Sequence, residues 1–293
     1  MFDLTCLVKR NIYKFLRDKT AVFFSFLSVI ILLALYFLFI GRQYTTGGQL
    51  DLIDENLRTF LGVSIIMGGV LVINTISLSL GVMGNVITDL ENRRLDGFLV
   101  TPVKRYKIIL SYYLSAIIVT AILSLLMWFL TILYVGLISG YWYSFSTIIQ
   151  ASGLIIFYTF ISASLMIFLT TLMKSVNAFG ALSGILGTIV GFISGIYMPL
   201  FVLGKSMTYV ASVVPFTHMT IVLKQVLLKE PYRLLALEVS QELVDEIELP
   251  YGTLELGVFG QEVNMWIIMG CIIAISFILM LIAYKNMTKK IKN

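Results

Sequence analysis

The sequence predicts an all-α polytopic membrane protein with six transmembrane helices. Its composition is the first reason: 59% of the 293 residues are hydrophobic and only 13% are charged, whereas soluble domains carry roughly a quarter charged residues. The second reason is the arrangement of the charges, which fall in short groups between long apolar runs. Each run reaches or exceeds the roughly 20 residues that a helix needs to cross a bilayer.

The apolar runs define one transmembrane domain over residues 21–293. Between Lys107 and Lys174 there is no charged residue. That stretch is too long for one span, and an aromatic turn at 140–143, suited to a membrane interface, divides it. We therefore expect the six spans at residues 21–40, 60–86, 108–138, 148–173, 176–203 and 265–284.

The basic residues predict the orientation of the spans. Fifteen of the 21 Lys and Arg residues lie on the side of the two termini, which also holds the loop between the second and third spans. Short cytoplasmic loops carry an excess of Lys and Arg. We therefore expect both termini and this central loop in the cytoplasm.

Residues 1–20 predict an N-terminal amphipathic helix that lies in the membrane interface. The apolar residues fall on one helical face, and the basic residues lie mostly off that face, where they would meet anionic lipid. The apolar face is formed by Leu4, Leu7, Val8, Ile12, Phe15 and Leu16, and the basic residues are Lys9, Arg10, Lys14 and Arg17. A simple basic leader without a defined helix is the alternative.

The largest segment outside the spans covers residues 204–262. Its stretch Phe216–Leu228 is apolar but too short to span, which predicts an external re-entrant or interfacial helix. A small acidic extracellular insert follows, with a short helix around Leu234–Val244. Because His218 is the only histidine, we expect it to have a structural role at the helix start, with Pro215 and Phe216, rather than to bind a metal.

The sequence lacks the residues that several classes of protein function require. The expected spans contain no ionisable side chain, which disfavours an ion-coupled mechanism. The phosphate-binding loop pattern is incomplete before Lys205, because Pro199 stands where a glycine is required. We therefore expect no nucleotide, cofactor or metal bound by this chain, no nucleic-acid partner and no catalytic site. Cys6 and Cys271 lie near opposite ends of the chain, so we expect no disulfide.

Two sets of residues inside the spans carry alternative predictions. Asn74 and its neutral polar neighbours indicate either hydrogen bonds between helices or a substrate-lining role. In the fifth span, five glycines recur at intervals of three or four residues, which places them on one helical face. That face is expected to serve helix packing within this chain, a dimer contact or the transport path. The glycines are Gly180, Gly184, Gly187, Gly191 and Gly195.

The central loop, residues 89–107, combines acidic residues, arginines, a glycine and a Thr-Pro pair. Thr101 is disfavoured in a helix because it precedes Pro102, so we expect a short charged helix that ends before the third span. With its surroundings the loop resembles the type-2 permeases of ABC transporters. The residues that match the pattern of that family in this loop are Glu91, Arg93, Arg94, Gly97, Thr101 and Pro102. Residues 194–199 and 215–218 provide two further matches.

The resemblance implies a membrane subunit of a bacterial ABC exporter in the cytoplasmic membrane. The leader would be the connecting helix, and residues 89–101 the coupling helix that docks on a separate ATPase. Two ATPase subunits, which carry ATP and Mg²⁺, and a second permease copy or paralogue would complete the transporter. The cargo would be an amphipathic drug, a peptide antibiotic or a lipid-like compound. The expected ATPase-coupling residues are Glu91, Arg93, Arg94, Asp96, Gly97, Thr101 and Pro102.

Two other function classes stay open at this level. One is an ion-coupled carrier or channel, which would transport its cargo without an ATPase. The other is a membrane sensor that uses the acidic extracellular segment to bind a ligand or partner.

Overall fold

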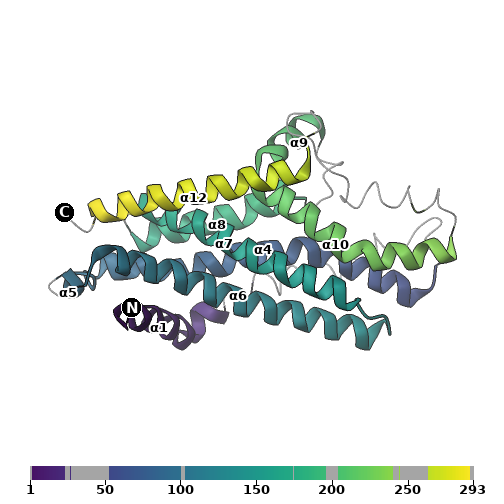
Figure 1. Cartoon of the computed structure of the whole chain (residues 1–293), viewed down its shortest axis with the longest axis horizontal. Coiled ribbons are helices and arrows are strands. Elements are labelled where there is room, and N and C mark those ends of the chain that lie inside the picture. The colour runs from purple at the N-terminus through teal and green to yellow at the C-terminus, as the bar shows by residue number, and fades with distance from the viewer. Residues whose placement is uncertain are drawn as a thin grey trace.

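The computed structural model describes residues 2–23, 27, 53–99, 103–173, 175–195, 204–239, 244 and 263–290. Over these residues the regular secondary structure is helical, without strands, and the long helices run side by side (Figure 1). Five of them are long and apolar enough to cross a membrane, so the chain is a multi-pass membrane protein. They are α4 (Glu55–Glu91), α6 (Arg105–Ile138), α7 (Phe145–Leu172), α8 (Val176–Ile193) and α12 (Met265–Lys290).

Helix α4 is the centre of the bundle, and α6, α7, α8 and α10 (Pro215–Glu238) all pack against it. Its 37 residues span about 55 Å, so its ends extend beyond a hydrocarbon core of about 30 Å. Asp54 caps its N-terminus by accepting hydrogen bonds from the amides of Asn56 and Leu57. Farther along, Thr75 Oγ1 is bonded to Ser162 Oγ on α7 at 2.9 Å. At this point two neutral hydroxyl groups link the buried faces of α4 and α7.

Helices α6 and α7 are separated at the aromatic turn. Gly140 has a φ of +71°, a conformation that glycine adopts without strain. Ser144 then caps α7 by accepting a hydrogen bond from the Thr147 amide at 3.2 Å. Trp142 folds back onto α6, where a Cβ at Gly136 would lie only 2.5 Å from its ring. This turn therefore fixes two antiparallel neighbours in the bundle.

Helices α9 (Gly204–Val213) and α10 meet at an angle of 87°, the geometry of a broken span or a re-entrant loop. Pro215 begins α10 and has no amide hydrogen to leave unsatisfied. The start of the short helix expected around Leu234–Val244 belongs to α10, which continues unbroken from Pro215 to Glu238, and residues 240–243 lie outside the described part of the chain. Its buried face continues through Leu227, Pro231 and Leu235, so packing extends the helix past the start of the acidic segment.

Several expected segments lie outside the described residues. These are most of the first span (21–40), the end of the fifth span after residue 195, and the acidic insert beyond residue 239 except for Val244. Helix α1 (Phe2–Arg17) lies beside α6 and α4, and α5 (Asp96–Leu99) follows α4. We call the end of the bundle that holds α1, α5 and the last turns of α12 the α5 end (Figure 1).

Candidate functional site

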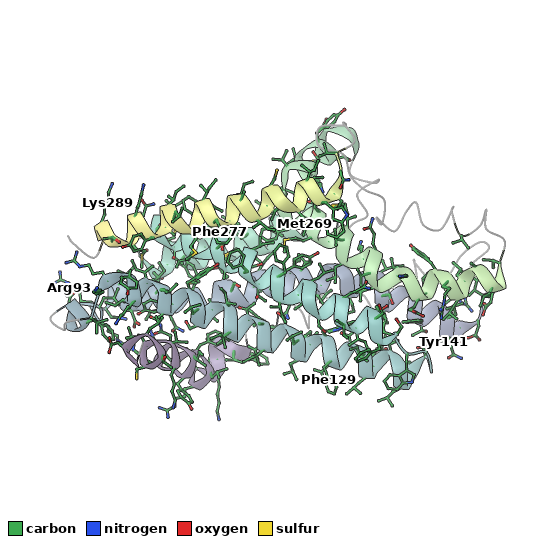
Figure 2. All side chains as sticks on the ribbon, in the orientation of Figure 1. Arg93, Phe129, Tyr141, Met269, Phe277 and Lys289 are labelled. Atoms are coloured by element: carbon green, nitrogen blue, oxygen red, sulfur yellow. The ribbon has the colours of Figure 1, made fainter. Side chains whose placement is uncertain are left out.

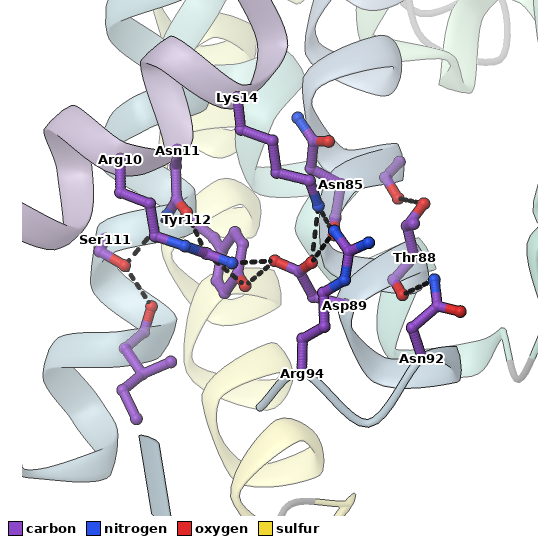
Figure 3. A network of polar contacts seen from close by, with 12 residues as sticks. Arg10, Asn11, Lys14, Asn85, Thr88, Asp89, Asn92, Arg94, Ser111 and Tyr112 are labelled. Carbon is purple, nitrogen blue, oxygen red and sulfur yellow. Dashed lines mark hydrogen bonds and ion pairs between the residues drawn. The ribbon is translucent and has the colours of Figure 1, made fainter. Parts of the chain in front are cut away.

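Asp89 lies in the last turn of α4, has no exposed surface, and is the centre of a polar network at the α5 end (Figure 3). Its Oδ2 accepts hydrogen bonds from Tyr112 Oη at 2.7 Å and from Arg10 Nη2 at 2.9 Å. Its Oδ1 accepts one from Lys14 Nζ at 2.6 Å. A buried ionised carboxylate is tolerated only where cations and donors surround it. Donors from α1 and α6 therefore stabilise the charge of Asp89 on α4.

The helical pattern of the sequence explains why Asp89 faces inward. It continues the buried face of α4 marked by Val82 and Val86, at spacings of four and three residues. On α1 the buried face repeats every four residues through Leu7, Asn11 and Phe15. Both faces meet at the junction with α6, so the network forms where two regular helix patterns converge.

Two further contacts attach α1 to α6. Asn11 Nδ2 donates to Ser111 Oγ at 3.2 Å between two buried side chains. Lys107 Nζ forms an ion pair with Asp3 Oδ2 at 2.7 Å. The hydrogen bond from Lys107 and its positive charge hold the pKa of the Asp3 carboxyl below its usual value. This ion pair is therefore present at neutral pH and is lost in acid, when the Asp3 carboxyl takes up a proton.

The same network reaches α5. The guanidinium of Arg10 lies 5.1 Å from the centre of the Phe98 ring, in a cation–π arrangement. Arg94 Nη1 lies 3.8 Å from Asp89 Oδ1, and Leu95 is buried in the hydrophobic core. Arg10 therefore contacts α4, α5 and α6 together, which ties the short helix to the long ones.

The other residues expected at this site lie on the surface. Glu91, Arg93, Asp96 and Gly97 are all exposed. Glu91 Oε2 accepts a hydrogen bond from the amide of Val176 at 3.2 Å, at the start of α8. Arg93 has a φ of +52°, so the turn between α4 and α5 places a side chain in the left-handed region that favours glycine.

Gly97 has open space around it, because a Cβ built there would meet no described atom within 4 Å. Packing of the described residues therefore does not require a glycine at this position. Thr101 and Pro102 lie outside the described residues. The α5 end thus combines an exposed charged segment with a buried ionic anchor directly beneath it.

One expectation for the leader is wrong. Arg10 and Lys14 were expected on a basic face toward anionic lipid, but both side chains turn toward Asp89, where they are 32% and 21% exposed. Leu16, expected on the apolar face, is exposed instead. Asn11 and Phe15 are buried on this side of α1, so Arg10 and Lys14 beside them reach Asp89 instead of lipid.

Comparison with known protein families supplies the identification. The family described as "ABC-2 family transporter protein" matches residues 45–285. The chain belongs to the ABC-2 transporter family. Among curated proteins, none matches the sequence. Family membership makes this protein a transporter permease and implies association with an ABC ATPase partner.

The glycine face of the permease is open along much of α8. Gly180 and Gly184 are exposed, and a Cβ at either of them or at Gly187 would meet no described atom within 4 Å. Gly191 and Gly195 are buried, and Gly195 lies just past the helix end with a φ of +69°. For the first three glycines, packing against the described part of the chain does not explain the pattern, so the dimer and path roles stay predictions.

Asn74 is buried on α4, and its Nδ2 donates to Ser124 Oγ on α6 at 3.3 Å. This is an interhelical hydrogen bond, one of the two roles expected for it. Its Oδ1 has no hydrogen-bond partner among the described residues. The substrate-lining role of Asn74 stays a prediction.

The residues expected at the start of the re-entrant helix lie at the bend between α9 and α10. Pro215 begins α10, and Phe216 is buried. His218 is also buried, and its Nε2 is hydrogen-bonded to Ser212 O at 2.8 Å, across the bend. The described residues contain no group of three metal-ligating side chains. The histidine therefore links α9 to α10.

Sequence reasoning missed two kinds of functional residue in the permease. Lys224 belongs to the segment expected outside the spans, whereas its side chain is buried in α10 and donates to Gly195 O at 3.4 Å. Sequence reasoning also treated Asp89 as part of an exposed charged loop. The spacing of Asp89 from Val82 and Val86 was the available signal, because it continues the buried face of the preceding span.

Proposed function

We propose that this permease is the membrane subunit of an ABC exporter, driven by separate ATPase subunits that contact the exposed face of α5. Its cargo is an amphipathic or apolar compound, such as a drug, a peptide antibiotic or a lipid-like molecule, moved outward. ATP and Mg²⁺ bind to the ATPase subunits. Two such subunits and a second permease, identical or homologous, complete the transporter, with both termini of this chain in the bacterial cytoplasm.

The observation that carries the proposal is the anchoring of α5. Its exposed face offers Asp96, Gly97 and, in the preceding turn, Arg93 to a partner. Beneath it, Asp89 on α4 is bonded to Tyr112 on α6 and to Arg10 on α1. A push on α5 would therefore reach α4, which precedes it in the chain, and Arg10 on α1, which contacts Phe98 of α5.

The composition of the helices supports the choice of cargo. The expected spans contain no Asp, Glu, Lys, Arg or His, and a highly charged cargo would need such groups along its path. The open glycine face of α8 is available for a second permease or for the cargo itself. We assign the path to the region beside this face.

Charge reversal on the face of α5 tests the proposal. The tagged permease would be purified from its native membrane, and Mg²⁺-dependent ATP hydrolysis by the co-purified complex measured. In Arg93→Glu and Asp96→Lys, one lost charge-assisted contact weakens the complex about tenfold or more. Lys229→Glu, an exposed charge on α10, is the matched control and keeps full activity.

Two outcomes would contradict the proposal. One is the absence of any ATP-hydrolysing subunit that co-purifies with the wild-type permease. The other is equal loss of activity in the Lys229→Glu control and in the two α5 variants. Transport by the purified chain alone in liposomes, without ATP, would instead favour an ion-coupled carrier.

A further inference from the structure

A small apolar pocket lies between α6, α7 and α12 at the α5 end. Its volume is about 210 Å³, and its lining consists of aliphatic side chains, a methionine and tyrosines, among them Ile109, Ile167, Met280 and Leu281. Pockets for drug-sized ligands usually have roughly 300–1,000 Å³ and several converging polar groups. This pocket is smaller and its lining is apolar, so its size and chemistry suit a hydrocarbon chain rather than a cargo molecule.

The one buried tyrosine of the lining keeps its hydroxyl group away from a ligand. Tyr113 Oη is hydrogen-bonded to Ser164 Oγ on α7 at 2.7 Å. Because that bond satisfies the hydroxyl within the bundle, the ring is what Tyr113 offers to the pocket. An apolar chain can therefore fill the pocket without leaving a polar atom unsatisfied.

The rim of the pocket has the features of a membrane–water interface. Tyr106 at the start of α6 and Tyr284 near the end of α12 line the pocket and are both exposed. Tyrosine is enriched where hydrocarbon meets the lipid headgroups. Each ring is followed or preceded in the sequence by a cation, Arg105 beside Tyr106 and Lys285 beside Tyr284. The pocket therefore begins at headgroup depth, between the helix ends that carry Arg105 and Lys285.

All charged residues of the three helices that surround the pocket are basic. Helices α6, α7 and α12 contain no Asp or Glu, and every charged residue in them is basic and lies at the α5 end; Figure 2 marks Lys289 there. These residues are Arg105, Lys107, Lys285, Lys289 and Lys290. Basic residues at this depth attract anionic headgroups.

We propose that this pocket binds an acyl chain of an anionic phospholipid from the leaflet at the α5 end, with the lipid phosphate held near Arg105 and Lys285. The lipid would join α6 to α12 on the outer surface of the bundle. The proposal concerns a lipid bound without ATP and does not depend on the direction of transport or on the cargo. Its failure would leave the proposed transport function untouched.

Native mass spectrometry of the purified full chain tests the lipid site. The protein in detergent would receive phosphatidylglycerol and phosphatidylcholine in equal amounts and with identical acyl chains. The wild-type protein is expected to retain the anionic lipid preferentially. Leu281→Trp fills the mouth of the pocket and should abolish this preference. Ile267→Trp is the matched control, because Ile267 is similarly exposed at the opposite end of the same helix (60% against 62%) and does not line the pocket.

A variant that removes two positive charges tests the lipid site independently. Each basic residue beside an anionic lipid contributes about a factor of five in affinity, so the double variant Arg105→Gln, Lys285→Gln should bind phosphatidylglycerol on the order of 20-fold more weakly. Its binding of phosphatidylcholine should stay unchanged, and Lys229→Gln should behave as the wild type. Equal retention of the two lipids by the wild-type protein would overturn the proposal. So would identical lipid retention in Leu281→Trp and Ile267→Trp.

Discussion

Arg10 and Asp89 are 79 positions apart in the sequence, and Arg10 Nη2 lies 2.9 Å from Asp89 Oδ2. The contact joins the helix that precedes the first expected span to the last turn of α4. It places the N-terminal helix in the same ionic network as the exposed segment α5.

Replacing Asp89 by Asn should destabilise the permease by about 2 kcal/mol, because the charged donors Arg10 and Lys14 then lose an ionised acceptor. Thermal unfolding of the purified protein measures the effect. Asp96→Asn is the control: its carboxylate is exposed, so its stability should change by less than about 0.5 kcal/mol. Equal unfolding temperatures for the two variants would refute the anchoring role of Asp89.

Lys14→Met should loosen α1, because it removes the 2.6 Å contact with Asp89. Hydrogen exchange of the amides of residues 2–17 should then speed up, while the amides in the middle of α4 keep their protection. Lys9→Met serves as the comparison, since Lys9 is exposed on the same helix. If both variants exchange alike, the bond from Lys14 does not hold α1 in place.

Gly97→Leu should fold normally and lose ATPase coupling. A Cβ at Gly97 meets no described atom within 4 Å, so the described part of the chain leaves room for a side chain that a docked partner would meet. Unfolding temperature and ATP hydrolysis by the complex are the two measurements. Gly136→Leu should instead lower the unfolding temperature strongly, because a Cβ there would lie 2.5 Å from Trp142. A fully active Gly97→Leu complex would argue against docking at α5.

Gly68→Ala should destabilise the permease by about 1–3 kcal/mol through overpacking. A Cβ at Gly68 would lie 2.5 Å from Lys224 Cγ and 3.2 Å from Lys224 Cα, so α10 would have to move away from α4. Gly153→Ala on α7 is the contrasting variant, since its Cβ meets no described atom within 4 Å. Alanine there should be neutral or stabilise by about 0.5–1 kcal/mol. Thermal unfolding of both variants distinguishes these outcomes.

The helical fold was accessible from the sequence because long apolar runs have few alternatives in a bilayer. The direction in which each charged residue points was harder to infer. Arg10 lies off the apolar face of α1 by periodicity, and only the position of Asp89 on α4 explains why it turns inward. That contact depends on how two helices meet, which the local sequence does not encode.

The burial of Lys224 on α10 likewise depends on how helices meet and could not be predicted from the local sequence. A lysine in a segment outside the expected spans is ordinarily placed at the protein surface. Burial became possible because Gly68 allows the backbone of α4 to approach the lysine stem, and because the carbonyl of Gly195 accepts its hydrogen bond. Gly68 and Gly195 are distant from Lys224 in the sequence, so the residues that neighbour Lys224 could not predict its burial.

Site-directed cross-linking from α5 tests the central claim most directly. Both exposed cysteines, Cys6 and Cys271, would be replaced by serine, and a single cysteine introduced as Asp96→Cys or, for comparison, as Ile122→Cys on the exposed surface of α6. The proposed function predicts that Asp96→Cys cross-links to the ATPase subunit in native membranes and that Ile122→Cys does not. The absence of an ATPase cross-link from Asp96→Cys in an actively transporting complex would contradict the claim that ATP hydrolysis is coupled through α5.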